Sequence, residues 1–302
     1  MAPMSKLSWT LLLTASMAGI AAFYPITKIL DGAIDPFLLA FFRFSIAALV
    51  LLPFILYKGT LALPQKRDFP LFALVALCGV IATSLIFFGI ERANSIVSAI
   101  LVNTNPLMIA LLSPFLISEY VTKSKRVGLI VGFIGVIVIV LNWHDPVTLF
   151  KSEYFWGSLI LLAAAIFASI NKIYSKGLVR MYDGLYVTFL ATAFGAAMLS
   201  AVAVFNGAIP QVIDAAVSHP LALLTIGVVS TAIPWTIWSS SLKHLDVHVA
   251  ASFSLLIPIF AALYSFIFLT EDFTLWMLFG MILTSAGIYI VQREEKIVVA
   301  TA

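Results

Sequence analysis

Ten apolar runs, each about as long as a helix that crosses a bilayer, fill almost the whole of the 302-residue chain. The hydrocarbon core of a membrane is about 30 Å thick, and roughly 20 apolar helical residues are needed to cross it. Strands of a membrane barrel would alternate apolar and polar residues, whereas stretches such as 127–141 are apolar on every face. The sequence therefore predicts an all-α polytopic membrane protein. The expected spans are 8–30, 36–57, 69–90, 96–117, 124–142, 154–175, 183–205, 219–242, 248–269 and 273–292. The segments between them, including 206–218, are expected to be short loops.

The basic residues predict how these spans are oriented. Lys28, Arg43 and Lys172 are set aside because they fall within spans. Of the other 14 Lys and Arg residues, twelve fall on one side of the membrane if successive spans alternate in direction and Lys125 and Arg126 are counted at the starting end of the fifth span. The opposite side holds only Arg92 and Lys151. Because Lys and Arg are enriched on the cytoplasmic side, we expect a multi-pass membrane protein with a cytoplasmic N-terminus and C-terminus. No basic face is clustered enough for nucleic acid, so no nucleic-acid partner is expected.

The two halves of the chain share a weak internal repeat. A shift of 152 residues superimposes proline, glutamate and glycine residues of the two halves: Pro106 on Pro258, Glu119 on Glu271, Gly128 on Gly280 and Gly135 on Gly287. Nearer the start of each half, a shift of 144 residues superimposes Lys28 on Lys172. We therefore expect a five-helix repeat in 1–145, a second in 150–295 and a short cytoplasmic tail in 296–302. An odd number of helices inverts the second copy, as in many secondary transporters, although duplication also produces channels and membrane enzymes.

Short motifs in both halves carry a family resemblance. The first half contains Phe-Tyr-Pro-Ile-Thr-Lys at 23–28, Pro36 and Phe-Arg-Phe at 42–44, and Phe-Leu-Ile-Ser-Glu at 115–119 is matched by Phe-Leu-Thr-Glu at 268–271. The chain resembles the EamA branch of the drug/metabolite transporter superfamily, although Phe-Tyr replaces the common Trp-Gly of the first helix. The resemblance implies two copies of a five-helix domain and efflux of amino acids, other small metabolites or xenobiotics across a bacterial inner membrane.

Ionisable residues inside spans are candidates for function because they are costly in hydrocarbon. Arg43 anchors a carboxylate or phosphate, or else it reaches the outer headgroups or pairs with Asp35 or Asp31. Lys28 and its counterpart in the sixth span either reach the headgroups or face a wet cavity, because each shares a helix face with other polar residues.

Polar and aromatic residues near prolines complete the candidate site. Asn103, Asn105 and Pro106 predict a kinked fourth span that hydrogen-bonds a solute, or else links helices. Tryptophans beside Pro234 in the eighth span predict a cavity wall, because one should lie near the membrane midplane. The resemblance in part implies a cavity between the first, third, fourth, sixth, eighth and ninth spans, with Pro106, Pro234 and Pro258 as bend points. The expected substrate-binding residues are Tyr24, Lys28, Asn103, Asn105, Asn171, Lys172, Trp235 and Trp238.

Glycines and glutamates suggest structural roles. Gly128, Gly132 and Gly135, with Gly280 and Gly287, follow the small-xxx-small pattern of close helix packing. This seam joins either the two halves of one chain or two protomers, so a monomer and a homodimer both remain open. At the ends of corresponding spans, Glu119 and Glu271 either cap helices or pair in a gate.

Together these features predict a secondary transporter, and not an enzyme, that moves small metabolites by alternating access. Amino acids are the expected substrate and export the expected direction; the alternatives are a xenobiotic or nucleotide-sugar-type carrier and a channel. No acidic residue or histidine lies at membrane depth, which favours a facilitator or exchanger over a proton-coupled carrier, and zwitterionic or anionic solutes over simple cations. The single Cys78 excludes an internal disulfide. No metal or other cofactor is expected, and the partners are a small-molecule substrate and the lipid bilayer.

Overall fold

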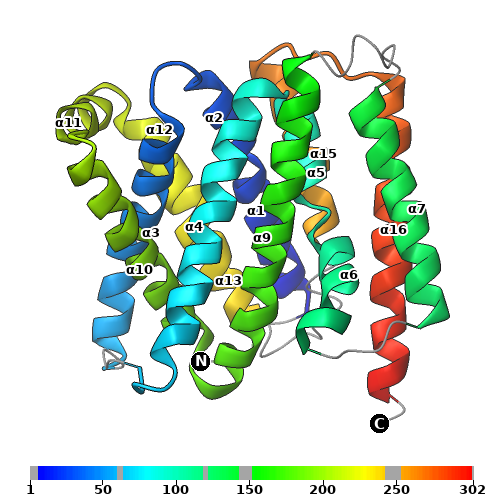
Figure 1. The fold of residues 1–302 in the computed structure, drawn as a ribbon, viewed down its shortest axis with the longest axis horizontal. Coiled ribbons are helices and arrows are strands. Elements are labelled where there is room, and N and C mark those ends of the chain that lie inside the picture. The colour runs from blue at the N-terminus through cyan, green and yellow to red at the C-terminus, as the bar shows by residue number, and fades with distance from the viewer. Residues whose placement is uncertain (1–5, 60–63, 118–121, 143–151, 242–252, 301–302) are drawn as a thin grey trace.

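A computed structural model describes residues 6–59, 64–117, 122–142, 152–241 and 253–300, and all regular secondary structure in these ranges is helical (Figure 1). This confirms the all-α prediction. The helices are α1 (Lys6–Ala21), α2 (Phe23–Ile29), α3 (Pro36–Tyr57), α4 (Phe69–Arg92), α5 (Ser95–Val102), α6 (Asn105–Ile117), α7 (Lys123–Leu141), α9 (Glu153–Met181), α10 (Gly184–Phe205), α11 (Ile209–Ser218), α12 (Pro220–Leu224), the π-helix η1 (Thr225–Ala232), α13 (Ile233–Ser241), the 3₁₀ turn η2 (Phe253–Leu255), α15 (Leu256–Phe268) and α16 (Leu275–Ala300).

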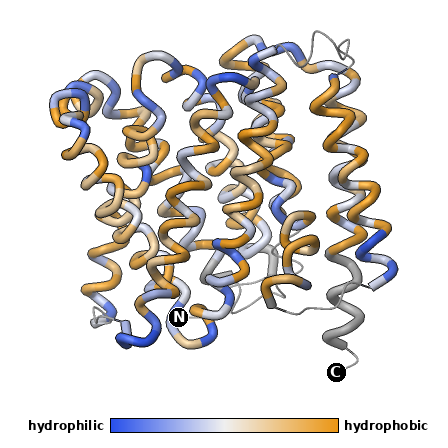
Figure 2. Tube along the Cα trace, in the orientation of Figure 1, coloured by the Kyte–Doolittle hydropathy of each residue, from blue (hydrophilic) through white to orange (hydrophobic). Residues whose placement is uncertain are grey.

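Eight helical segments in the described part of the chain are long and apolar enough to cross a membrane, and two further apolar helices, Phe253–Phe268 and Leu275–Val291, are shorter. Hydrophobic residues dominate the lengths of the helices, and hydrophilic residues gather towards their ends (Figure 2). The chain is thus a multi-pass membrane protein, with a helix in each of the ten expected ranges. That all ten cross the bilayer as two inverted repeats stays a prediction. The eight long segments are Ser8–Ile29, Pro36–Tyr57, Phe69–Arg92, Ser95–Leu116, Lys123–Leu141, Glu153–Met181, Gly184–Phe205 and Pro220–Trp238.

Contacts between helix ends agree with spans that alternate in direction. Where the third and sixth spans meet at one end, Arg92 Nε lies 3.4 Å from Glu153 Oε2. At their other ends the Tyr182 hydroxyl donates to Asp68 Oδ2 at 2.7 Å. Each contact joins ends that alternation assigns to the same side of the membrane. Which side is cytoplasmic stays a prediction.

Three spans are irregular where a continuous α-helix would be expected from their length. The first divides at Ala22 into α1 and α2, the fourth divides at Asn103 and Thr104 into α5 and α6, and the eighth is a π-helix over Thr225–Ala232 before α13. In the fourth span, Pro106 lies in the first turn of α6, where its missing N–H costs nothing. The predicted kink is therefore present, as a full interruption of the helix.

Glycines bring α7 and α16 into backbone contact at one edge of the bundle (Figure 1). A Cβ added at Gly287 would lie 2.6 Å from the carbonyl oxygen of Gly128, and one added at Gly135 would lie 2.8 Å from that of Gly280. Such approach requires residues without side chains. The small-xxx-small prediction is confirmed, and the seam joins two helices of the same chain. Glu119, the counterpart of Glu271 for which capping or gating was expected, lies outside the described residues.

The segment between the seventh and eighth spans corrects a prediction. Residues 206–218 were expected to be a loop, but most of them form helix α11. Pro210 occupies the first turn, a position that favours proline, and Ile209, Ile213 and Val217 recur every four residues as an exposed apolar stripe. This spacing is the helical signal that the sequence interpretation missed.

Candidate functional site

Arg43 is buried in the bundle between two aromatic side chains. Its residue in α3 is only 8% exposed. The guanidinium carbon lies 4.3 Å from the centroid of the Phe23 ring of α2 and 5.9 Å from that of the Trp235 ring of α13. A guanidinium over an aromatic face at these distances makes a cation–π contact. Arg43 therefore links the first, second and eighth spans.

The structural partners considered for Arg43 from the sequence are occupied elsewhere. Asp35 Oδ1 caps α3 by accepting from the Phe37 N–H at 2.8 Å, and Asp31 Oδ2 pairs with Lys28 Nζ at 2.8 Å. Burial also separates Arg43 from the headgroups. Over the described ranges the guanidinium has neither an ion pair nor a hydrogen bond, so the contacts that its charge makes are with aromatic faces.

Tyr24 and Asn103 connect the irregular parts of the first and fourth spans. The Asn103 amide donates to the Tyr24 hydroxyl oxygen at 3.4 Å and to the Ala99 carbonyl at 2.7 Å. Tyr24 is 3% exposed, and its ring meets that of Phe23 edge to face, with centroids 5.3 Å apart. Tyr24 and Asn103 therefore contact each other, and Tyr24 also contacts Phe23, which lies on Arg43. Trp235, a third predicted residue, lies on Arg43 as well.

A second polar group lies between the fourth and sixth spans. The Ser169 hydroxyl of α9 donates to the Ala165 carbonyl at 2.7 Å and also lies 3.3 Å from Asn105 Oδ1 of α6. Lys172 is one helical turn beyond Ser169 on the same face. Lys172 is exposed in the structure.

The remaining predicted residues make contacts between helices. Lys28 Nζ donates to the Glu91 carbonyl at 2.7 Å as well as pairing with aspartate, and Asn171 Nδ2 donates to the Val75 carbonyl at 2.7 Å. Trp238 is partly buried and packs against the main apolar core. The structure does not bring these three into the group around Arg43, and their contact with substrate stays a prediction.

Arg43 and Phe23 are absent from the residues expected to bind substrate. Arg43 lies eight residues into an expected span, whereas Arg126 lies at the very start of one. The rarity of charge at the depth of Arg43 is the signal that favours it. Phe23 gave no separate signal, because phenylalanine is common throughout the spans.

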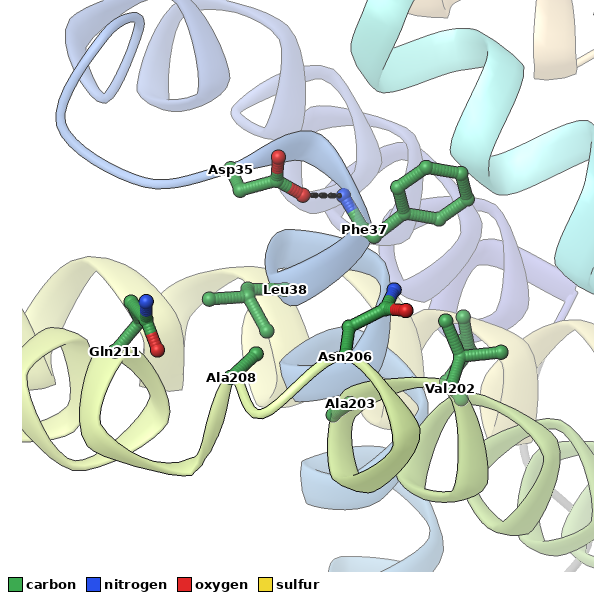
Figure 3. Close-up of a pocket in the computed structure, with 9 residues that line it drawn as sticks. Asp35, Phe37, Leu38, Val202, Ala203, Asn206, Ala208 and Gln211 are labelled. Atoms are coloured by element: carbon green, nitrogen blue, oxygen red, sulfur yellow. Dashed lines mark hydrogen bonds between the residues drawn. The ribbon is translucent and has the colours of Figure 1, made fainter.

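A separate pocket lies at the end of the bundle where α3 begins and α10 turns into α11 (Figure 3). Asp35, Asn206 and Gln211 supply its polar lining, and Phe37, Leu38 and Val202 are among its apolar residues. No residue of the Arg43 group lines it, and the Asp35 carboxylate is turned to the Phe37 N–H. This pocket lies at helix ends and is distinct from the candidate site.

The candidate site offers binding groups without a metal-binding set. Across the described residues, no three His, Cys, Asp or Glu side chains come together as metal ligands. What the site presents is a guanidinium, a phenol, an amide and aromatic faces. These groups bind a solute through charge, hydrogen bonds and stacking.

Comparisons with known proteins also indicate a transporter. The model of the EamA-like transporter family matches twice, over residues 7–141 and 155–293. Relatives include a protein of Archaeoglobus fulgidus named as an uncharacterized transporter, 26% identical over 94% of this chain and 97% of its own length. A WAT1-related chloroplastic protein of Arabidopsis thaliana is 26% identical over 96% of this chain and 70% of its own length. A solved crystal structure that is 19% identical has the same fold, with a TM-score of 0.60 over 95% of this chain and 98% of that one.

Proposed function

Because the chain belongs to the EamA-like transporter family, as its motifs predict, we propose that it exports small metabolites, above all amino acids, across the cytoplasmic membrane by alternating access. Family membership makes the protein a transporter of small molecules in the membrane and not an enzyme. The substrate, the direction and the membrane are the proposal.

The proposed architecture is a pair of inverted five-helix repeats, in 1–145 and 150–295. The family model matches once within each range, over 7–141 and 155–293, and the sequence repeat has the same period. An odd number of helices inverts the second copy, and exchange of conformation between inverted copies opens a central site to each side in turn. The cytoplasmic position of both termini follows from the excess of basic residues on that side.

The observation that carries the proposal is the meeting of three interrupted spans at one buried polar group. Irregular backbone at membrane depth is tolerated where it lies against protein or lines a water-filled cavity. Here the interruption at Ala22 precedes Tyr24, Asn103 ends α5, and Trp235 follows the π-helix. Discontinuous helices of this kind form substrate sites near the midplane of many transporters.

Amino acids fit this group better than the alternative solutes do. A bare cation would meet the Arg43 charge, and the Asp and Glu residues of the sequence fall between the expected spans or at their ends. A nucleotide sugar would bring two phosphate charges to a single guanidinium. Without an acidic relay at depth, exchange or facilitated diffusion is the proposed mode, and a channel would lack the coupling that exchange requires.

Counterflow in proteoliposomes tests the proposal. Vesicles are loaded with a mixed pool of unlabelled amino acids, and entry of each labelled amino acid is followed in turn. Saturable entry that internal substrate accelerates, and that Asn103→Ala and Trp235→Ala abolish, is the expected result. Trp156→Ala is the matched control, because Trp156 on α9 is 54% exposed at the surface of the bundle.

Two results would contradict the proposal. Entry of no amino acid, with entry of sugars, nucleosides or drug-like cations instead, would assign another substrate class. Entry that internal substrate does not accelerate would indicate a channel.

A further inference from the structure

We propose that Arg43 is the carboxylate-binding residue of the transport site, so that substrates carry one free carboxylate beside an apolar or aromatic group. This inference rests on the proposed function and deepens it by naming the chemistry that the site selects.

The first step is the charge of the buried guanidinium. Removing a charge from water is costly unless an opposite charge or hydrogen-bond acceptors replace the lost hydration. Arg43 is 8% exposed, and no carboxylate in the described ranges lies within 4 Å of it. Aromatic faces offset part of this cost, but they accept none of the five N–H groups of the guanidinium. The site therefore has an unmet preference for an anion.

The second step is the orientation of the guanidinium. The Phe23 ring lies 4.3 Å below it, and Phe23 is itself fixed by edge-to-face contacts with Tyr24 and Phe87, with centroids 5.3 and 5.0 Å away. An aromatic face provides no oxygen acceptor, so this contact leaves the guanidinium N–H groups available as donors. Two parallel N–H groups match the two oxygens of a carboxylate. Packing alone thus prepares Arg43 for a planar acid.

The third step concerns the rest of the solute. Trp235 lies 5.9 Å from the Arg43 guanidinium carbon and is partly exposed, so its indole provides an apolar surface beside the bound carboxylate. Asn103 uses its amide N–H groups on Tyr24 and the Ala99 carbonyl. Its Oδ1 accepts no hydrogen bond from the described residues and can accept one from a substrate ammonium. An apolar α-amino acid satisfies all three groups.

One guanidinium also limits the charge of the solute. Among the described contacts, Arg43 is the one cation of this group, and it lies against Phe23 of α2 and Trp235 of α13. A monocarboxylate is neutralised by Arg43 alone, while a phosphate dianion would retain an uncompensated charge in an aromatic environment. The inference therefore commits to a monocarboxylate.

The test compares acids with their carboxamides. L-Leucine and L-phenylalanine, and the amide of each, compete for counterflow of the labelled amino acid in vesicles that hold wild type, Arg43→Gln, Arg43→Lys or Arg180→Gln. Wild type should bind each acid at least about 30-fold more tightly than its amide, which corresponds to the loss of a buried charge pair. Arg43→Gln should remove this preference, and Arg43→Lys should restore part of it because charge remains without the planar fork. Arg180 is exposed near the end of α9, and its variant should behave as wild type.

Each outcome separates the inference from the function on which it rests. Equal binding of acid and amide by wild type would overturn the inference while amino-acid transport stood. So would transport by Arg43→Gln with the acid preference intact. Entry of neither compound in wild type would instead refute the proposed function. If Arg43→Gln does not fold, the wild-type comparison and Arg43→Lys still decide.

Discussion

Replacing Gly287 by alanine places a methyl group inside the seam between α7 and α16. Its Cβ would lie 2.6 Å from the Gly128 carbonyl oxygen, whereas ordinary van der Waals contact begins at 3.4 Å. The two helices must therefore separate locally by about 0.8 Å. The backbone of Gly132 is also in the way, so a side chain cannot turn aside to make room. Gly177 is a matched control, since it is also helical and an added Cβ there meets nothing within 4 Å.

The magnitudes give the two substitutions opposite signs. A gap of 0.5–1 Å removes about a quarter to a half of the dispersion energy of each separated contact, and overpacking costs about 1–3 kcal/mol. Alanine inside a helix is favoured over glycine by roughly 0.5–1 kcal/mol. Gly287→Ala should therefore lower the free energy of unfolding by up to about 2.5 kcal/mol, and Gly177→Ala should raise it by about 0.5–1 kcal/mol.

The single cysteine provides the assay. Cys78 is buried in α4, so a dye that fluoresces on reaction with thiols reports unfolding as the purified protein is heated. With a shift of roughly 2–4 °C for each kcal/mol, Gly287→Ala should melt a few degrees below wild type and Gly177→Ala slightly above it. A rise in both melting temperatures would refute the reasoning, because it would mean that helix propensity outweighs contact at the seam.

Two other predictions concern helix ends. The hydrogen bond from Tyr182 to Asp68 raises the pKa of the Tyr182 phenol. The contribution of this hydrogen bond to stability is therefore complete below the ordinary tyrosine pKa of about 10 and is lost as pH rises through the higher folded value. Melting curves from pH 8 to 12 should show this alkaline loss in wild type and a smaller one in Tyr182→Phe, and equal losses would exclude the contribution. The Glu271 carboxylate accepts hydrogen bonds from the backbone N–H groups of Ser95 at 2.9 Å and Ile96 at 3.3 Å. Glu271→Gln should cost about 0.5–1 kcal/mol of stability through the lost charge at a helix N-terminus, and Glu271→Ala should cost about 1–2 kcal/mol through the lost acceptor. A melting temperature of Glu271→Gln equal to that of wild type would contradict the charge effect.

Sequence predicts the features of this protein that are set within one span. The ten apolar runs locate the helices because a bilayer demands continuous apolar length. Pro106 marks the interruption of the fourth span, since a proline inside a helix removes a hydrogen bond and crowds the preceding turn. Gly128 and Gly135 identify a close-packing face, since only small residues permit backbone contact.

Features that depend on how one span is rotated against another were not predictable. A span that contains Arg43 can turn it to lipid, to an aspartate or to the interior, and the choice depends on Phe23 and Trp235 from other spans. Lys28 likewise finds its acceptor at Glu91 only in the folded bundle. The partner of the glycine seam was open for the same reason, because one helix face does not identify the helix that covers it.

The aromatic enclosure of Arg43 has a consequence for biosynthesis. Phe23 precedes Arg43 in the chain and emerges with it, but Trp235 follows roughly 190 residues later, which is about 10–40 s of translation at 5–20 residues per second. During that interval the second span enters the membrane with a guanidinium covered on one side, at a cost of about 2.5–3.5 kcal/mol near the centre of an isolated helix. The strongly apolar remainder of Pro36–Tyr57 outweighs that cost. The nascent first and second spans should consequently stay together as a hairpin at the insertion site until the eighth span arrives.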